Sequence, residues 1–335
     1  MNDYVYISLA QEDRIVSLEL EQASGKAIPR GSFEIEGGPS AMVVAPSLEL
    51  IYVGLRSKPG IAALGLERTT GNLALQSAIA LDDDPCYLSI DRTGRFLFSS
   101  YYGAGKVGVH PIGEGGALLT TAAQWHKTAL NAHSIQSDPS NRFAFVPHTG
   151  PNRIFQFLFD ETNGHLNPNS PDRLAPAESD GPRHFCFHPN GRHVCFVNEQ
   201  GSSITVYELN QRTGALAPVQ TVSTLPSDFT GENSCSQIHI TPDGRYLYAS
   251  NRGHDSIACY TVDADSGRLA LIELASTEKT PRAFNLDTKG RYLLATGLDT
   301  GKLATYKISP DTGSLVPLEV QSLGRRPMWV LVIPR

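Results

Sequence analysis

The stretch GPRHFCFHPNGRHVCFVNE, residues 181–199, combines residue types that can bind an anion and move a proton. Arg183 and His184 begin a short apolar run, and Glu199 follows a second run after the turn HPNGR. A guanidinium holds carboxylates and phosphates through paired hydrogen bonds. A Glu or His beside it can act as a general base when its pKa suits the working pH. If the two runs pair as a hairpin, the pattern predicts an arginine-lined site with a base at one end of that hairpin.

The same stretch recurs along the chain as a repeated unit. Related units begin at residues 39, 85, 132, 182, 235 and 281, and PMWVLVIPR (327–335) is a final partial copy. The spacing of about 46 to 53 residues between units built from short β-type runs is typical of propeller blades.

Each unit carries signals for four short strands. The first run alternates apolar and polar residues, as at Phe185 and Phe187, which predicts a half-buried strand. An Asn-Gly or Asp-Gly turn follows, and then come a run rich in aromatic residues, such as RYLYAS, and two further runs.

The two ends of the sequence are complementary fragments of one unit. The last copy stops after one strand, and YVYISLAQEDRIVSLEL (4–20) matches a unit from its second strand onward. Pairing of the two fragments would close a ring and remove an exposed sheet edge. We therefore predict an all-β fold with a single domain over residues 1–335. It is a seven-bladed β-propeller with four antiparallel strands per blade, closed by N-terminal strands that pair with the C-terminal strand.

Positions that differ between the units indicate the site. The second and third residues of a unit begin the innermost strand and the last residue ends the next one, so antiparallel pairing brings them to one face. Charged or titratable residues at these positions are His133, Arg183, Glu199, Arg252 and Arg282, with Arg56 and His184 at equivalent places. We predict that they converge on one mouth of the channel. His239 lies mid-strand, where its side chain is expected to face the channel.

Several of these residues also have a structural interpretation. Arg183 and Glu199 could form only a cross-strand ion pair, and His184 and His239 could be buried channel residues. Arg192 occupies a turn position that repeats as Arg, which is typical of a solvated side chain.

Composition and charge argue against several other classes of protein. The net charge of −6, with no run of Lys or Arg, argues against nucleic-acid binding. No stretch reaches the roughly 18 apolar residues of a membrane span, and the first residues lack a signal-peptide pattern. The five cysteines are scattered and form no CxxC motif, which argues against a disulfide framework and against a zinc site. The sequence also has no HExxH motif, and we expect neither a metal nor another cofactor. We expect a cytoplasmic protein that is a monomer or a weak homo-oligomer.

The repeat units resemble those of the lactonase family of seven-bladed propellers. The stretches that carry the resemblance are PSAMVVAPSLELIYVGLR, GPRHFCFHPNGRHVCFVNE, IHITPDGRYLYASNR, PRAFNLD and PMWV. The resemblance is close to bacterial 6-phosphogluconolactonases and extends to fungal carboxymuconate lactonizing enzymes. It implies metal-free hydrolysis of 6-phospho-D-glucono-1,5-lactone, a small anionic sugar lactone, in the pentose phosphate pathway. By the same resemblance the catalytic residues are His133, Arg183, Glu199 and Arg252. His148 in VPHTG departs from the family pattern and could reach the mouth.

Three functions follow as hypotheses. The first is a lactone hydrolase in which Arg282 and Arg252, with or without Arg56, hold the anionic group. His184 and His239 are expected to be further substrate contacts, and Glu199 or His133 is expected to activate water. The second is a carboxymuconate cycloisomerase, which needs the same anion clamp and a proton donor. The third is a non-enzymatic propeller that binds a protein partner, because the fold alone does not determine the function.

Overall fold

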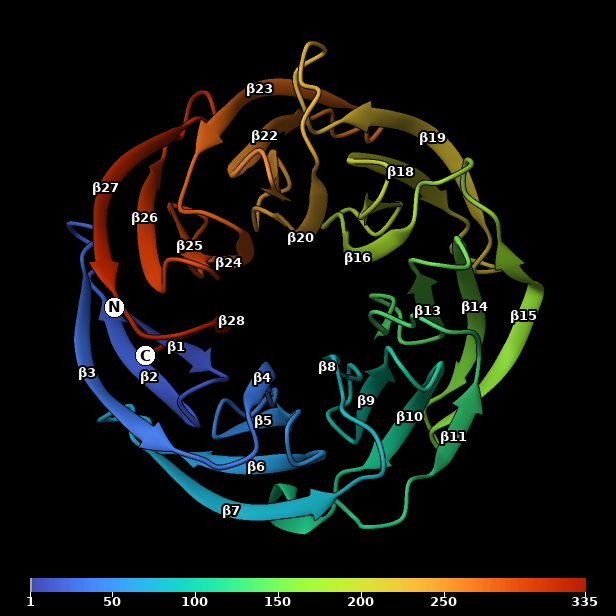
Figure 1. The fold of residues 1–335 in the computed structure, drawn as a ribbon. Helices are drawn as coiled ribbons and strands as arrows, with labels where there is room; N and C mark the ends of the chain where they lie inside the picture. Colours follow the sequence, from blue (N-terminus) through green and yellow to red (C-terminus); the bar gives the residue numbers. More distant parts are fainter. Residues whose placement is uncertain (1) are drawn as a thin grey trace.

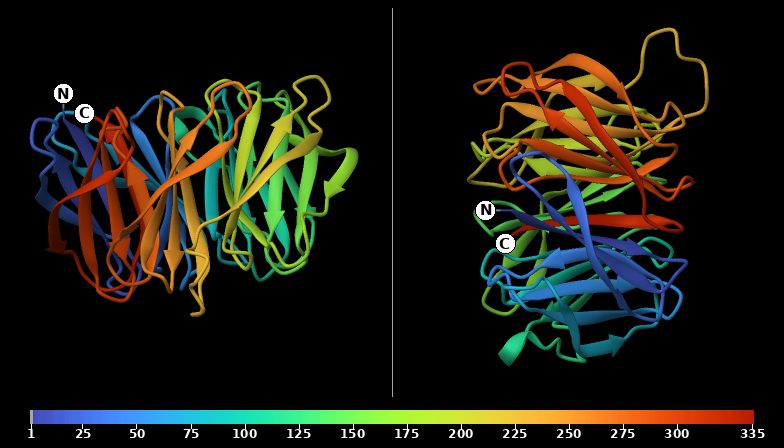
Figure 2. Two further views of the ribbon diagram at one scale, coloured as in Figure 1. Left: turned by 90° about the horizontal axis from the view of Figure 1, so that it is seen from above. Right: turned by 90° about the vertical axis from the view of Figure 1, so that its left-hand side faces the viewer.

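A computed structural model describes residues 2–335 as seven four-stranded antiparallel sheets around a central channel (Figure 1). Seen edge-on, the sheets stand side by side in one disc (Figure 2). The predicted seven-bladed propeller is confirmed.

We number the blades 1 to 7 and give the strands of each from the channel outward. Blade 1 contains β28 (Pro327–Pro334), β1 (Asp3–Leu9), β2 (Arg14–Leu20) and β3 (Ala27–Glu34). Blade 2 contains β4 (Pro39–Val44), β5 (Leu50–Leu55), β6 (Gly60–Leu66) and β7 (Leu73–Ala80). Blade 3 contains β8 (Tyr87–Ile90), β9 (Phe96–Tyr101), β10 (Lys106–Pro111) and β11 (Gln124–Lys127), with the short helix η1 (Glu114–Gly116) before β11. Blade 4 contains β12 (Gln136–Ser137), β13 (Phe143–His148), β14 (Arg153–Asp160) and β15 (His165–Leu174).

The remaining three blades follow the same order. Blade 5 contains β16 (Pro182–Phe187), β17 (His193–Asn198), β18 (Ser203–Leu209) and β19 (Leu216–Ser223). Blade 6 contains β20 (Ser234–Ile240), β21 (Tyr246–Arg252), β22 (Ser256–Val262) and β23 (Leu269–Ser276). Blade 7 contains β24 (Pro281–Leu286), β25 (Tyr292–Gly297), β26 (Lys302–Ile308) and β27 (Leu315–Ser322).

The ring closes within blade 1. The C-terminal strand β28 pairs antiparallel with β1, which places Leu331 opposite Tyr6 and Val332 opposite Val5. Every residue of β1 is buried. The closure therefore covers an apolar strand that would otherwise be a free sheet edge.

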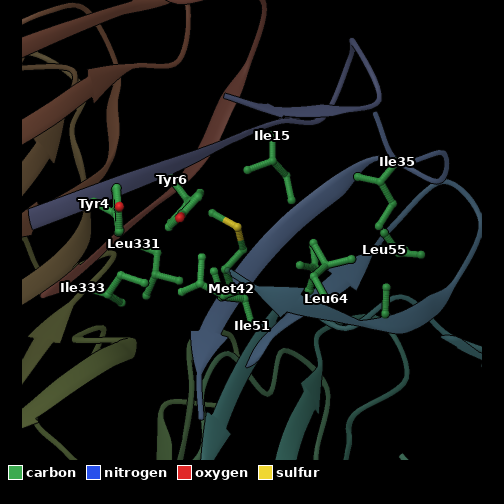
Figure 3. Close-up of a cluster of buried hydrophobic side chains, with 13 residues drawn as sticks. Tyr4, Tyr6, Ile15, Ile35, Met42, Ile51, Leu55, Leu64, Leu331 and Ile333 are labelled. Atoms are coloured by element: carbon green, nitrogen blue, oxygen red, sulfur yellow. The ribbon is translucent and has the colours of Figure 1, made fainter. Parts of the chain in front are cut away.

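Adjacent blades pack face to face through apolar side chains. Between blades 1 and 2, a buried cluster joins Tyr6 and Leu331 to Met42, Ile51 and Leu64 (Figure 3). The alternation of each inner strand supplies these contacts, because every second side chain points to the same face of the sheet.

A turn glycine allows each blade to fit closely against its neighbour. Tyr246, at the start of β21, packs over the turn between β26 and β27, and the hydroxyl of Tyr248 donates to the carbonyl of Gly313 at 2.8 Å. Gly313 has φ +73°, and a Cβ atom there would lie 2.2 Å from the Tyr246 ring. The turn therefore requires glycine for both its backbone angle and its space.

Most innermost strands contain a β-bulge near their first residues. In blade 5 the register shifts between Pro182 and His184, and in blade 7 between Pro281 and Ala283. A bulge bends the strand and turns a side chain in a new direction. The two residues within these bulges are Arg183 and Arg282.

Blade 4 has a shorter innermost strand than the sequence predicts. The alternating run from residue 132 forms a ladder only over Gln136–Ser137, although the His133 N–H still donates to the Pro147 carbonyl at 3.0 Å. Pro147 has no N–H to donate in return, so the ladder is interrupted beside His133.

Candidate active site

The second and third residues of the units line a pocket at one mouth of the channel. As the side chains stand, this mouth pocket has a cavity volume of about 10 Å³, which is room for about one water molecule, so a larger ligand requires the wall side chains to move apart. Its walls are formed by Ser40, Ala41, Arg56, Cys86, Arg183, His184, Gln237, Arg282, Met328 and Trp329. All of them except Arg56 are second or third residues of a unit, so the positions at which the units differ do meet in space.

Glu199 lies between two arginines beside the mouth pocket. Its Oε1 accepts a hydrogen bond from Arg252 Nη2 at 2.7 Å, and its Oε2 lies 3.3 Å from Arg183 Nε without hydrogen-bond alignment. Burial raises the pKa of Glu199, but the charges of Arg183 and Arg252 outweigh it and hold that pKa below the usual value. Glu199 is therefore an ionised carboxylate at neutral pH.

Arg183 is held rigidly although it carries a charge. Arg183 is only 2% exposed, and its Nη1 donates a hydrogen bond to the backbone carbonyl of Ser236 at 2.5 Å. The Ser134 hydroxyl in turn donates to the Arg183 carbonyl at 2.9 Å. Burial and the nearby Arg252 lower the pKa of Arg183, and Glu199 opposes them. The guanidinium stays protonated, because arginine does not lose its proton in proteins.

Arg282 has no carboxylate partner among residues 2–335. Burial and the charges of Arg252 and Arg56 lower its pKa to about 10. Arg56 stands at the rim, where its Nε lies 2.7 Å from Asp84 Oδ2. Four guanidinium groups at the mouth thus face two carboxylates, which leaves a local excess of positive charge in a chain of net charge −6.

Two neutral histidines lie beside the arginines. The rings of His133 and His184 meet edge to face, with centroids 5.1 Å apart. Burial and the charge of Arg183 lower the pKa of both imidazoles well below 6.5. His184 forms part of the pocket wall, whereas His133 lies behind the wall, and its Nδ1 has no hydrogen-bond partner in the part of the chain described.

Two other candidate histidines do not line the mouth pocket. His239 lies two residues beyond Gln237 on β20, where its ring meets Phe284 edge to face at 4.8 Å. His148 is fully buried within blade 4, with its Nδ1 3.1 Å from the Leu130 carbonyl. His148 therefore does not reach the mouth pocket.

Three features of the site were not anticipated from the sequence. They are the bulges that direct Arg183 and Arg282, the Ser236 carbonyl that binds Arg183, and the pairing of Arg56 with Asp84. Only the last had a signal, because the acidic run DDD (82–84) directly precedes a unit.

Two kinds of feature are absent from residues 2–335. No group of three or more His, Cys, Asp or Glu side chains is placed to hold a metal ion. The same residues contain no helix whose length and apolar character would let it cross a membrane.

Comparison with known proteins agrees with this architecture. The family described as lactonase, 7-bladed beta-propeller, matches residues 4–332. The 6-phosphogluconolactonase of Klebsiella pneumoniae (strain 342) is 36% identical over 334 residues, which is 99% of each chain. That of Serratia proteamaculans (strain 568) is 32% identical over 336 residues, which is 100% of each. The solved structure of the Pseudomonas aeruginosa periplasmic gluconolactonase aligns with a TM-score of 0.92 at 23% identity, covering 99% of both chains, which shows a shared fold. The chain belongs to the lactonase family of seven-bladed β-propellers.

Proposed function

We propose that this protein hydrolyses a phosphorylated sugar lactone, 6-phospho-D-glucono-1,5-lactone, to 6-phosphogluconate. The observation that carries the proposal is the excess of guanidinium groups over carboxylates at the mouth. Membership of the lactonase family supports the reaction class, and two full-length relatives named 6-phosphogluconolactonase support the substrate.

Each arginine has a distinct role in this proposal. Arg282 binds the phosphate, because its charge is not neutralised by a carboxylate of the described chain, and Arg56 assists at the rim. Arg183 is fixed by Ser236 and faces the pocket, so it is preorganised to stabilise the oxyanion that forms on the lactone carbonyl. Arg252 holds Glu199 in place. His184 contacts the sugar from the pocket wall, and His239 supports the channel below it.

In this proposal the attacking water gives its proton to Glu199, beside the mouth pocket, or to His133, behind the pocket wall. Water adds to the carbonyl carbon, the ring C–O bond breaks, and a proton reaches the ring oxygen, which becomes the free hydroxyl. Both groups are unprotonated at neutral pH, so each can accept the proton. Replacing the true base, by Glu199→Gln or His133→Asn, should lower kcat about 100-fold or more, because general-base catalysis contributes about that much. The other substitution should cost much less.

We also propose that the protein acts in the cytoplasm as a monomer or weak homo-oligomer, without a nucleic-acid partner. A phosphorylated sugar lactone is charged and does not diffuse across membranes, which favours the compartment where sugar phosphates form. The outer strand β27 exposes Val316, Leu318 and Val320, which favours weak self-association. Sedimentation velocity over a range of concentrations tests the oligomeric state.

A substrate panel tests the proposed reaction. Purified protein is assayed with 6-phosphogluconolactone, gluconolactone and carboxymuconate, and the spontaneous hydrolysis of each lactone is subtracted. We expect the phosphorylated lactone to have the highest kcat/KM. Turnover of carboxymuconate alone would establish the cycloisomerase instead, and no turnover of any substrate would favour a protein-binding propeller.

A further inference from the structure

Trp329 lies between two cavities of the central channel. It lines the mouth pocket from one side. It also lines a second cavity, where Tyr87, Gln136, Asn285 and Leu331 form part of the wall. The second cavity includes the turn residues that follow the inner strands β4 and β8, so it opens toward the opposite face.

Three rings meet at this division of the channel. Trp329 and Tyr87 pack edge to face with centroids 5.5 Å apart, and Tyr87 and His184 do so at 4.9 Å. Trp329 and His184 lie 6.0 Å apart. We call these three residues the aromatic floor, because two of them line the mouth pocket and all three separate it from the space beyond.

The aromatic floor is fixed in place by hydrogen bonds and by packing. Gln136 Nε2 donates to the Tyr87 hydroxyl at 2.8 Å and to the Phe185 carbonyl at 2.9 Å. Trp329 belongs to β28, which pairs with β1, and it packs against the apolar cluster between blades 1 and 2 and against that between blades 2 and 3. The indole is only half-buried, so part of its surface faces the channel.

We propose that Trp329 determines specificity by forming the surface on which the lactone ring lies. The inference rests on the proposed function. A six-membered sugar ring presents C–H bonds on its faces, and such a face packs well on a flat aromatic ring. The polar groups of the sugar edge would then point to the arginines on the wall. With the phosphate on Arg282 and the ring on Trp329, Arg183 is the other buried guanidinium in the wall of the same pocket and would bind the carbonyl.

Tryptophan fluorescence provides a direct test, because the chain contains two tryptophans. The other, Trp125, lies on the outer strand β11 and is 45% exposed. In a Trp125→Phe variant, Trp329 is the only fluorophore of this kind. Glucose 6-phosphate is a stable probe that retains both the six-membered ring and the phosphate. We expect a saturable change in Trp329 fluorescence, with a midpoint equal to the Kd measured by calorimetry.

Kinetics supply the second measurement. Trp329→Leu should raise KM for 6-phosphogluconolactone about tenfold, the usual scale of one aromatic contact. Trp329→Phe should restore most of the affinity, and Trp125→Phe serves as the matched control. Melting temperatures identify any variant whose fold is damaged, and the fluorescence experiment does not depend on substituting Trp329.

The outcomes separate the inference from the proposed function. Binding of glucose 6-phosphate in the calorimeter with unchanged Trp329 fluorescence would overturn the role of Trp329, while the lactonase proposal would stand on its own turnover. A Trp329→Leu variant that folds and keeps the original KM would also overturn it. If the unmodified protein has no lactonase turnover, the proposed function fails, and the inference fails with it.

Discussion

The arginines at the mouth differ in which groups they already bind. Arg183 and Arg252 share Glu199, and Arg56 pairs with Asp84, whereas Arg282 has no carboxylate partner among residues 2–335. A cation that is not neutralised gains most from an incoming anion. The sequence placed all four arginines at variable positions and suggested the pair Arg183–Glu199. It did not show that Arg252 also binds Glu199 or that Arg56 binds Asp84, because side-chain pairing depends on how neighbouring strands and loops meet.

Arg282 should therefore determine the preference for phosphorylated substrates. In Arg282→Ala, kcat/KM for 6-phosphogluconolactone should fall by about 10- to 150-fold, since a charge-assisted contact contributes roughly 1.5–3 kcal/mol. The kcat/KM for gluconolactone should fall much less. Steady-state kinetics with both lactones measure the ratio. Arg192→Ala, at an exposed turn, is the control. An equal loss for both lactones would contradict the assignment of phosphate to Arg282.

The pH dependence of turnover should reflect the lowered pKa values of the candidate bases. Since the pKa of Glu199 and that of His133 are both below their usual values, each base remains unprotonated as the pH falls from 8 to 6.5. After correction for spontaneous hydrolysis, kcat/KM should stay level over this range and decline only in more acidic solution. An acidic limb centred at or above pH 6.5 would be inconsistent with either group as the base.

At the scale of the elements, the sequence predicted the strands better than their irregularities. Alternation and turn signals predicted paired runs such as β16 and β17, and these runs form the expected hairpins. The bulge at Arg183 leaves no mark in the alternation, because it depends on how the inner strand meets its neighbours. The short β12 follows from Pro147, whose effect on the preceding strand is visible only once the pairing is known.

The turn glycines test the packing between blades. Gly313→Ala combines an unfavourable positive φ with contact against Tyr246, so it should reduce the free energy of unfolding by about 2 kcal/mol. Gly31→Ala is the matched control, because Gly31 has no positive φ and its nearest neighbour would lie 3.9 Å from the added Cβ. Urea denaturation compares the two variants. Equal stabilities would show that this contact does not constrain the turn.

At the scale of the whole molecule, the repeat predicted the architecture and the ring closure. The incomplete copies at the two ends of the sequence matched one another, and β28 does pair with β1. Which histidines are buried could not be predicted in the same way. His110 and His148 are 1% and 0% exposed, which depends on packing between strands far apart in sequence.

These buried histidines should make the fold sensitive to acid. Burial lowers the pKa of His110 and His148 to about 4, below the value near 6.5 expected in the unfolded chain. The contribution of these two histidines to the free energy of unfolding is therefore fully present above pH 6.5. Between pH 6.5 and pH 4 the free energy of unfolding falls by up to about 1.4 kcal/mol per pH unit for each histidine, because the unfolded chain binds protons that the folded chain excludes. Urea denaturation at several pH values measures this slope.

One pair of variants isolates the contribution of His148. The pH slope should become shallower in His148→Leu, whereas replacing the exposed His165 by Gln should leave it unchanged. An identical slope in His148→Leu and the unmodified protein would show that His148 does not contribute to acid sensitivity. Turnover at pH 7.5 should be nearly unaffected, because His148 does not reach the mouth pocket.

The most direct test of the mouth as the site of lactone hydrolysis is the turnover of Arg183→Ala. With spontaneous hydrolysis subtracted, kcat/KM for 6-phosphogluconolactone should fall by about 100- to 1000-fold, the usual effect of removing one oxyanion-stabilising group. Circular dichroism should show that the propeller remains folded, since Arg252 still pairs with Glu199 in this variant. Turnover equal to that of the unmodified protein would show that hydrolysis takes place elsewhere.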